Sequence, residues 1–417
     1  MHIPRPVYLQ QLIDRMHNGM IKIITGLRRS GKSYLLFELF KEHLLSNGVK
    51  QENIIGIELD RRSNAKYCDP DDLLEYLNNR INAHEQYYIM IDEVQMLNDF
   101  VSVLNELLHY RNVDVYVTGS NSRFLSTDIL TEFRGRGDQI RIHPLAFSEY
   151  FSAFNGSPDE AWQEYFTYGG LPQIMAMKSD EQKIAYLNDL FEMTYIRDIK
   201  ERNHIRYETE LSELLDLLAS ATGSLTNPQK LANTFRSKRN SKFAETTISR
   251  YCKNLEDAFL LSKARRYDVK GKKYISTPFK YYFEDVGLRN ARLNFRQQEE
   301  NHIMENIIFN ELRYRGYSVD VGVVEVREKN QSGKELRKQL EIDFIANSGS
   351  KRYYLQSAFT LADPAKNEQE KRPYLRVNDS FKKIILVRDN IKIRRDDAGI
   401  TTMGIIDFLL NANSLEL

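Results

Sequence analysis

A glycine-rich loop between an apolar segment and a helical segment constrains the fold of this chain more than any other feature. Residues 21–24 are apolar except for Lys22, which predicts a buried strand, and residues 34–40 have the apolar spacing of a helix. Between them runs the pattern Gly-x-x-x-x-Gly-Lys-Ser, formed by Gly26, Gly31, Lys32 and Ser33. A strand, a loop of this pattern and a helix, in that order, are typical of a phosphate-binding P-loop.

The residue types of this loop suit the binding of a nucleotide together with its magnesium ion. Gly26 and Gly31 allow turns in which successive backbone N–H groups point at phosphate oxygens. Lys32 would neutralise the β- and γ-phosphates, and the Ser33 hydroxyl would bind Mg²⁺. The alternative, a glycine-rich surface turn, explains neither the strand before the loop nor the helix after it. We therefore predict ATP and Mg²⁺ as cofactors, with a nucleotide-binding loop made of Gly26, Leu27, Arg28, Arg29, Ser30, Gly31, Lys32, Ser33 and Tyr34.

A second apolar segment, residues 87–91, ends in the carboxylates Asp92 and Glu93. A carboxylate at the carboxyl end of a strand beside the P-loop strand can hold Mg²⁺ directly or through water, and we assign this role to Asp92. Glu93 is placed to take a proton from the attacking water. An adjacent acidic pair favours hydrolysis over nucleotide storage, whereas the alternative is two solvated carboxylates at the start of a loop.

A third apolar segment, residues 113–117, leads to polar residues near the expected γ-phosphate. Asn121, or else Ser120, would orient the attacking water from the tip of this strand. Arg134 and Arg136 follow a helical segment and would reach a phosphate in a neighbouring subunit. A surface salt bridge is the alternative for each arginine.

Together these motifs resemble those of AAA+ ATPases. The stretch from residue 118 to residue 137 is similar to the sensor and arginine-finger stretch of Holliday-junction branch-migration helicases. Nearly the whole chain resembles a large prokaryotic family of AAA-type ATPases with a C-terminal restriction-endonuclease-like domain of the PD-(D/E)XK type. The resemblance implies a P-loop core, ATP hydrolysis and a ring-shaped homo-oligomer. It is carried by the P-loop, by Asp92-Glu93-Val94-Gln95, by Thr118-Gly119-Ser120-Asn121, by residues 143–150, by Gly169-Gly170-Leu171-Pro172 and by Glu341-Ile342-Asp343.

At 417 residues, the chain is long enough for several domains. Its two cysteines, Cys68 and Cys252, lie far apart without CxxC spacing, which argues against a disulfide framework or a zinc site. No segment has the apolar length of a signal peptide or a membrane span, so we expect a cytoplasmic protein without a membrane partner. The expected fold class is α/β, with a parallel-sheet AAA+ core over residues 1–150, a helical lid over 151–204, a winged-helix domain over 205–296 and a restriction-endonuclease-like domain over 297–417.

Positive charge is concentrated in the middle of the chain. The net formal charge is +1, but residues 228–296 contain 17 Lys or Arg and 6 Asp or Glu, a difference of +11. Such an asymmetry is typical of a polyanion site, and we predict duplex or branched DNA as a partner. The alternatives are a basic face that meets an acidic face of another domain, and a winged helix that serves as a protein–protein module. The candidate DNA-binding residues are Thr247, Arg250 and Lys253 on the expected recognition helix, and Lys270, Lys272 and Lys273 on the expected wing.

The resemblance to restriction endonucleases implies a metal site, but part of its pattern is missing. Glu305 on an expected helix and Asp343 on an expected strand match the first two acidic positions. The next strand carries Gln356 and Ala358 where the pattern has glutamate and lysine. Hydrolysis of a phosphodiester at such a site needs carboxylates for Mg²⁺ and a lysine that places the water. We therefore expect a nuclease-like remnant, made of Glu305, Asp343 and Gln356, that does not cleave DNA.

The function predicted from the sequence is that of an oligomeric AAA+ ATPase that couples ATP hydrolysis to the binding or remodelling of DNA. Two alternatives stay open: a nucleotide-dependent signalling or defence switch that hydrolyses ATP slowly, and a DNA nuclease gated by ATP. Glu93 beside Asp92 favours turnover, the basic middle segment favours DNA, and Ala358 disfavours the nuclease.

Overall fold

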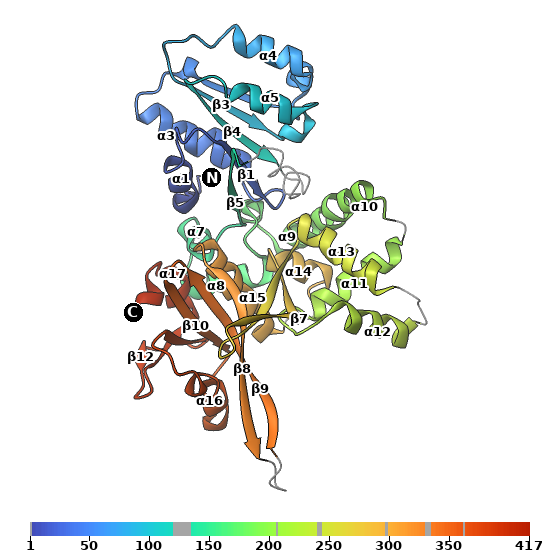
Figure 1. Cartoon of the computed structure of the whole chain (residues 1–417), viewed down its shortest axis with the longest axis vertical. Helices are drawn as coiled ribbons and strands as arrows, with labels where there is room; N and C mark the ends of the chain where they lie inside the picture. Colours follow the sequence, from blue (N-terminus) through green and yellow to red (C-terminus); the bar gives the residue numbers. More distant parts are fainter. Residues whose placement is uncertain are drawn as a thin grey trace. The chain divides into compact units, whose positions relative to one another are not determined.

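The computed structural model describes residues 2–119, 135–205, 207–239, 244–296, 299–329, 335–361 and 363–417. The chain folds into two compact units (Figure 1). The first comprises Met1–Pro144 with Asp257–Phe259, and the second comprises Leu145–Glu256 with Leu260–Leu417. Each unit is built on a sheet of its own.

The first unit contains a five-stranded sheet in the order β2-β3-β4-β1-β5, in which every pair of neighbours is parallel. Because β1 lies between β4 and β5, the P-loop starts from an inner strand of the sheet. The parallel sheet that was predicted for this part of the chain is confirmed. Its strands are β1 (Ile21–Gly26), β2 (Ile54–Glu58), β3 (Tyr87–Asp92), β4 (Val113–Gly119) and β5 (Gly137–Ile142).

Helices cover both faces of this parallel sheet (Figure 1). The helices α4 (Pro70–Asn78) and α5 (Phe100–Leu107) bury leucines against one face, where Ile23, Ile89 and Val117 belong to the same apolar core. On the other face, Phe40 packs against Tyr116 with ring centroids 4.7 Å apart. The remaining helical elements are α1 (Pro6–Ile13), α2 (Lys32–Tyr34), η1 (Leu35–Phe40), α3 (Lys41–Ser46), η2 (Gln51–Asn53), η3 (Arg62–Cys68) and η4 (Val94–Met96).

Lys22 is a charged residue inside the apolar β1 strand, and it is fully buried. Its ammonium forms an ion pair with a carboxylate oxygen of Asp114 in β4. The Tyr116 hydroxyl donates to the other oxygen of that carboxylate at 2.7 Å. A buried charge is tolerated only when it is paired and hydrogen-bonded, and this network lets β1 remain a core strand.

The second unit contains a mixed eight-stranded sheet in the order β12-β13-β11-β10-β9-β8-β6-β7. Strands β10, β11 and β13 are parallel to one another, whereas β8, β9 and β10 run antiparallel in turn. The strands are β6 (Leu261–Asp268), β7 (Lys273–Phe283), β8 (Ser318–Lys329), β9 (Glu335–Ser348), β10 (Lys351–Ala358), β11 (Lys382–Val387), β12 (Arg394–Arg395) and β13 (Ile400–Gly404).

The hairpin of β6 and β7 belongs to a different part of the fold from the one expected from the sequence. We expected it as the wing of a separate domain ending at residue 296. In the structure, β6 pairs in parallel with β8 through Arg266, Tyr267 and Asp268. This pairing makes the hairpin one end of the eight-stranded sheet, so the hairpin and the C-terminal strands share one unit.

The helices of the second unit include three, α11, α12 and α13, in the region where the winged-helix domain was expected. Asn227 caps the second of them, because its side-chain oxygen accepts the N–H of Lys230 at 2.7 Å. No helix within the described residues is both long and apolar enough to cross a membrane. The helical elements are α7 (Phe147–Ser152), α8 (Pro158–Tyr168), η6 (Pro172–Ala176), α9 (Asp180–Asp189), η7 (Leu190–Ile196), α10 (Arg197–Asn203), α11 (Glu208–Ser220), α12 (Pro228–Arg239), α13 (Glu245–Asp257), α14 (Val286–Arg292), α15 (Glu300–Tyr314), α16 (Pro364–Lys371), η8 (Tyr374–Arg376), α17 (Ile405–Leu410) and η9 (Ser414–Glu416).

The glycine pair after α8 packs closely against the start of α14. The buried carboxylate of Asp285 accepts the N–H of Gly170 at 2.7 Å and the N–H of Leu288 at 3.1 Å. A Cβ atom on Gly169 would lie 2.2 Å from this carboxylate, and one on Gly287 would lie 2.0 Å from the carbonyl oxygen of Tyr168. Small residues are therefore required where these two segments meet.

Candidate nucleotide-binding site

The loop between β1 and α2 is shaped by two glycines in conformations that larger residues avoid. Gly26 has φ 142° and Gly31 has φ 93°. A Cβ atom on Gly26 would lie 2.1 Å from the carbonyl oxygen of Ile142, the last residue of β5. The chain therefore turns at the carboxyl edge of the parallel sheet, directly before a helix, where backbone N–H groups can bind an anion.

Lys32 is the first residue of α2, and its side chain is buried within the loop. Its ammonium donates hydrogen bonds to the carbonyl oxygens of Gly26 at 3.2 Å and Leu27 at 3.0 Å. Burial lowers the pKa of Lys32 to about 8, although the carboxylates of Glu93 and Asp92 oppose this shift. A triphosphate would supply the anionic partner for an ammonium that has been removed from water.

The other residues of the loop differ in their exposure. Leu27 and Ser30 are buried, and the Ser30 hydroxyl has no hydrogen-bond partner within the described parts of the chain. Arg28 and Arg29 are exposed. Tyr34 is half-buried, and its hydroxyl accepts the N–H of Ile3 at 3.3 Å. Exposed guanidinium groups beside the loop suit an anionic ligand.

Arg5 holds the loop from outside the motif, and the sequence analysis missed it. Its guanidinium is buried and donates to the carbonyl oxygens of Ser30 at 2.9 Å and His143 at 2.7 Å. The two hydrogen bonds join the P-loop to the residue that follows β5. No local pattern marks Arg5, because its partners are 25 and 138 residues away in the chain.

Asp92 ends β3 beside the P-loop and is bonded to two hydroxyl groups. Thr118 of β4 and Ser33 of α2 both donate to its carboxylate. Burial raises the pKa of Asp92, and these two hydrogen bonds oppose that effect. The structure thus brings together the two residues predicted to hold Mg²⁺, and it adds Thr118 as a group that orients the carboxylate.

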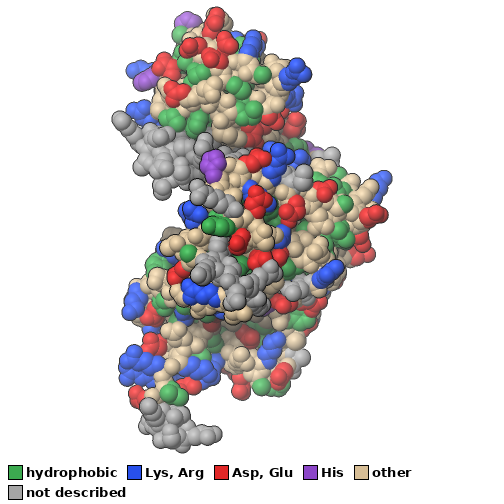
Figure 2. Space-filling model, turned by 90° about the vertical axis from the view of Figure 1, so that its right-hand side faces the viewer, with side chains coloured by type: hydrophobic (Ala, Val, Ile, Leu, Met, Phe, Trp, Pro, Cys, Tyr) green, Lys and Arg blue, Asp and Glu red, His purple; other side chains and the backbone are tan. Residues whose placement is uncertain are grey.

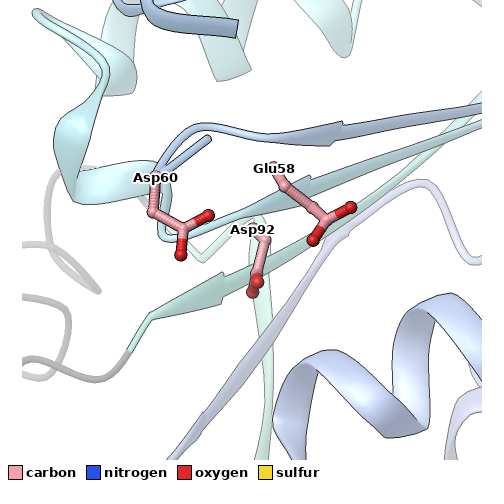
Figure 3. Close-up of side chains that lie close together, drawn as sticks. All are labelled: Glu58, Asp60 and Asp92. Atoms are coloured by element: carbon pink, nitrogen blue, oxygen red, sulfur yellow. The ribbon is translucent and has the colours of Figure 1, made fainter. Parts of the chain in front are cut away.

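Two further carboxylates, Glu58 and Asp60, lie next to Asp92 at the end of β2 (Figure 3). One carboxylate oxygen from each of the three residues lies within 4.8 Å of the others. Oxygen ligands from carboxylates and a hydroxyl are the donors that Mg²⁺ prefers, so this edge of the sheet fits the ion. The sequence analysis missed Glu58 and Asp60. Their position directly after an apolar strand next to β3 was the signal that could have found them.

Glu93 follows Asp92 with a left-handed backbone conformation, φ 50°. Its N–H donates to the Thr118 hydroxyl at 3.2 Å, and the Gln95 amide donates to its carboxylate. The side chain is half-buried. Thr118 therefore orients both acidic residues, because it donates to Asp92 and accepts from Glu93.

The predicted sensor and finger residues are only partly described. Ser120, Asn121 and Arg134 lie outside the described residues, directly after β4 and before β5. Arg136 is exposed, and its carbonyl oxygen accepts the N–H of Ile21, at the start of β1, at 2.9 Å. Its side chain is thus available at the surface of the first unit.

The candidate DNA-binding residues are found at the surface of the second unit. Arg250 and Lys253 are exposed on α13, and Thr247 is half-buried there. In the hairpin, the three lysines predicted for the wing, Lys270, Lys272 and Lys273, are exposed. The Lys270 ammonium donates to the carbonyl oxygen of Glu325 at 3.1 Å, which ties it to β8.

The charge of the basic segment is partly neutralised within the second unit. Lys280 forms ion pairs with Glu305 and Glu341, and Arg292 forms ion pairs with Glu192 and Asp216. On the face shown in Figure 2, Lys and Arg side chains are interspersed with Asp and Glu side chains. The difference of +11 counted from the sequence thus overstates the charge that this segment can offer to DNA.

The nuclease-like residues come together in the second unit, around a lysine that the sequence analysis did not consider. Lys280 lies 2.8 Å from Glu305 and 3.9 Å from Asp343. The side-chain oxygen of Gln356 accepts the N–H of Asp343 at 3.3 Å. No motif pointed to Lys280, because it lies on β7, outside the region assigned to the nuclease-like domain.

Two family models match the chain. An "AAA domain" matches residues 18–151, and a "Domain of unknown function (DUF8612)" matches residues 159–299. The first match contains the P-loop, Asp92, Glu93 and all five strands of the parallel sheet. The AAA core expected from the sequence is therefore confirmed, whereas no match tests a nuclease domain.

Relatives of the full chain are found in bacteria and archaea. An uncharacterized protein from Haemophilus influenzae is 34% identical over 414 residues, which covers 98% of both chains. The uncharacterized protein MJ1544 from Methanocaldococcus jannaschii is 27% identical over 89% of this chain and 81% of its own. The solved ORC1 protein of Aeropyrum pernix in complex with DNA is 10% identical over 70% of this chain and 93% of its own, with a TM-score of 0.30, too low to support an argument. The chain therefore belongs to the same family as the Haemophilus influenzae protein, and it carries an AAA domain of the P-loop ATPase type.

Proposed function

We propose that this protein hydrolyses ATP at the P-loop with Mg²⁺ as its cofactor. The observation that carries the proposal is the meeting of Lys32, Ser33 and Asp92 at the carboxyl edge of the parallel sheet, with Glu93 directly after Asp92. The AAA domain that matches residues 18–151 supports it.

Each residue has a separate role in this proposal. Lys32 binds the β- and γ-phosphates, and the backbone N–H groups of the loop bind the phosphate oxygens. Ser33 and Asp92 hold Mg²⁺, which would offset the negative charge of the phosphates. Glu93 accepts a proton from the attacking water, and the Gln95 amide keeps the Glu93 carboxylate in place.

The experiment compares ATP binding and ATP turnover in two variants. Lys32→Ala should lose nucleotide affinity, because the main positive charge on the phosphates is gone. Glu93→Gln should bind ATP as the wild type does, but its kcat should fall by roughly 10²–10⁴-fold, the usual contribution of a general base. Wild-type turnover by Glu93→Gln would show that the base is another residue.

The first unit offers matched controls for both variants. Lys50 and Glu52 have exposed side chains and lie outside the P-loop site. Lys50→Ala and Glu52→Gln should therefore bind and hydrolyse ATP at wild-type levels. Equal losses in these controls would mean that the substitutions act on folding rather than on the site.

We further propose that hydrolysis is coupled to DNA and takes place in a homo-oligomer. The DNA part is supported by the exposed Arg250 and Lys253 of α13 and the exposed Lys272 and Lys273 of the hairpin. The oligomer part is supported by the exposed Arg136 at the start of β5. ATPase rates with and without duplex, single-stranded and four-way-junction DNA test the coupling, since a DNA-coupled ATPase should be stimulated by at least one of them.

A further inference from the structure

Lys280 lies among the carboxylates of the nuclease-like cluster, which we define as Glu305, Glu341, Asp343 and Gln356. Its ammonium lies 2.8 Å from Glu305 Oε1, 2.7 Å from Glu341 Oε1 and 3.9 Å from Asp343 Oδ1. Lys280 comes from β7, Glu305 from α15, and the other two carboxylates from β9. One ammonium thus joins three elements of the second unit.

The arrangement of this cluster does not fit a divalent metal ion. Within the described residues, Glu58, Asp60 and Asp92 place three ligand atoms close enough together for a metal ion, whereas the nuclease-like cluster contains no such trio. The distances of 2.7 and 2.8 Å are those of charge-assisted hydrogen bonds, so Lys280 already occupies one oxygen of Glu305 and one oxygen of Glu341. A metal ion bound between the same carboxylates would also be repelled by the positive charge of the Lys280 ammonium.

The remaining hydrogen bonds hold the carboxylates in this arrangement. The Tyr282 hydroxyl donates to Glu305 Oε1 at 2.6 Å, and the N–H of Ser357 donates to Asp343 Oδ2 at 2.8 Å. Burial raises the pKa of Asp343 well above its ordinary value, and the Glu305 carboxylate adds to this effect. Burial opposes the charge on Lys280, but the three carboxylates raise its pKa above the ordinary value. These hydrogen bonds and ion pairs hold the carboxylates around the ammonium.

We infer that Lys280 takes the place of a divalent cation in the nuclease-like cluster, so that this cluster is an ion-paired tie between β7, α15 and β9 and binds no metal. Access does not explain the exclusion of a metal, because a pocket of about 940 Å³ lined by Glu341, Asp343 and Gln356 borders the cluster. The inference is independent of the ATPase proposal, because every residue in it belongs to the second unit.

The first test measures Mn²⁺ binding to nucleotide-free protein by electron paramagnetic resonance of the free ion. Wild type and Asp343→Asn should give the same binding curve, because the cluster contributes no site. Any Mn²⁺ held at the P-loop is common to both proteins and cancels in the comparison. Binding by the wild type that disappears in Asp343→Asn would overturn the inference.

The second test removes the ammonium. Lys280→Met should gain an Mn²⁺ site that is lost again in the double variant Lys280→Met with Asp343→Asn, because the freed carboxylates can then turn to a metal. The unfolding temperature of the single variant Lys280→Met should also rise when Mn²⁺ is added. Lys263→Met, at an exposed position on the neighbouring strand β6, is the control and should gain neither property. Folded Lys280→Met without a new site would contradict the inference.

A third measurement needs no substitution of Lys280. With Mg²⁺ or Mn²⁺ and ATP, the wild-type protein should leave duplex, single-stranded and branched DNA intact. Cleavage by the wild type that is abolished in Asp343→Ala would show that a metal does enter the cluster, and the inference would then be wrong.

Discussion

At the scale of single residues, Gly26 makes the backbone turn at which β1 ends and the P-loop begins. Its φ of 142° and the 2.1 Å approach of Ile142 leave no room for a side chain. Gly26→Ala should therefore lower both the free energy of unfolding and the affinity for ATP, because the loop must move away from β5. Denaturant unfolding and equilibrium ATP binding measure the two effects.

Gly48 provides the matched control for this substitution. It also has a positive φ, 85°, but a Cβ atom there would meet nothing within 4 Å. Gly48→Ala should cost only the backbone strain, about 1–2 kcal/mol, and should leave ATP affinity unchanged. Equal effects of the two substitutions would show that the approach of Ile142 is unimportant.

Asp285 is a second residue with a testable consequence, in this case for pH dependence. Burial raises the pKa of Asp285 to about 6, although backbone N–H groups of Gly170 and Leu288 favour its ionised form. Between pH 4 and 6, roughly, the folded protein then holds a proton that the unfolded chain, with the ordinary pKa of 3.8, has released. The free energy of unfolding should thus fall as the pH rises through this window, by on the order of 3 kcal/mol from this group.

Asp285→Asn isolates that contribution, because its amide does not titrate. Other buried carboxyls, such as Asp320 and Glu311, also have raised pKa values, so the absolute profile contains several groups. The difference in unfolding free energy between wild type and Asp285→Asn should change between pH 4 and 6 and be flat above pH 7. A constant difference across the whole range would contradict the assignment.

Residues inside a motif could be predicted, whereas those that support it from elsewhere could not. The positions of Lys32, Ser33 and Asp92 follow from local patterns, because strand, loop and helix spacing place them at one edge of the sheet. Arg5 and Lys280 act through partners that are distant in the chain, and nothing near them in sequence marks this role.

At the scale of elements, the hairpin of β6 and β7 and the helix α13 carry the proposed DNA contacts. Charge reversal in the pairs Arg250→Glu with Lys253→Glu, and Lys272→Glu with Lys273→Glu, should weaken binding to all DNA sequences alike. Each lost phosphate contact should also reduce the salt dependence of log K by about 0.9. Fluorescence anisotropy at several salt concentrations measures both quantities.

The opposite edge of the same sheet offers a control pair. Lys392 and Arg394 are exposed at and just before β12, whereas β7 is the strand at the other edge. Lys392→Glu with Arg394→Glu makes the same change in net charge and should bind DNA as the wild type does. If this pair weakened binding as much as the hairpin pair, the effect would come from total charge.

Individual helices and strands were easier to predict than the pairing of strands with one another. The helices α11, α12 and α13 lie within the expected winged-helix region, and local signals mark such helices, as the Asn227 cap and Pro228 do at the start of α12. The pairing of β6 with β8 joins segments more than 50 residues apart through three residues, and no turn or periodicity encodes it. The hairpin was therefore assigned to the winged-helix domain over residues 205–296, apart from the C-terminal strands.

At the scale of the whole molecule, the proposed oligomer predicts that one chain completes the site of another. Arg136→Ala should lose ATP hydrolysis but keep ATP affinity, because a finger arginine acts on the phosphates only during turnover. Mixing Arg136→Ala with Lys32→Ala protein should restore part of the activity, since a mixed interface pairs an intact P-loop with an intact arginine. No recovery at any ratio, with oligomers present, would argue against a shared site.

The close meeting of α8 and α14 also bears on how the family can evolve. Gly169, Gly170 and Gly287 each face a backbone or carboxylate oxygen at a distance that excludes any side chain. The need for glycine at these three positions comes from packing in the second unit and is independent of ATP chemistry. Lineages in which the P-loop has decayed would thus still be expected to keep these glycines, and their signature would trace common ancestry after catalysis has gone.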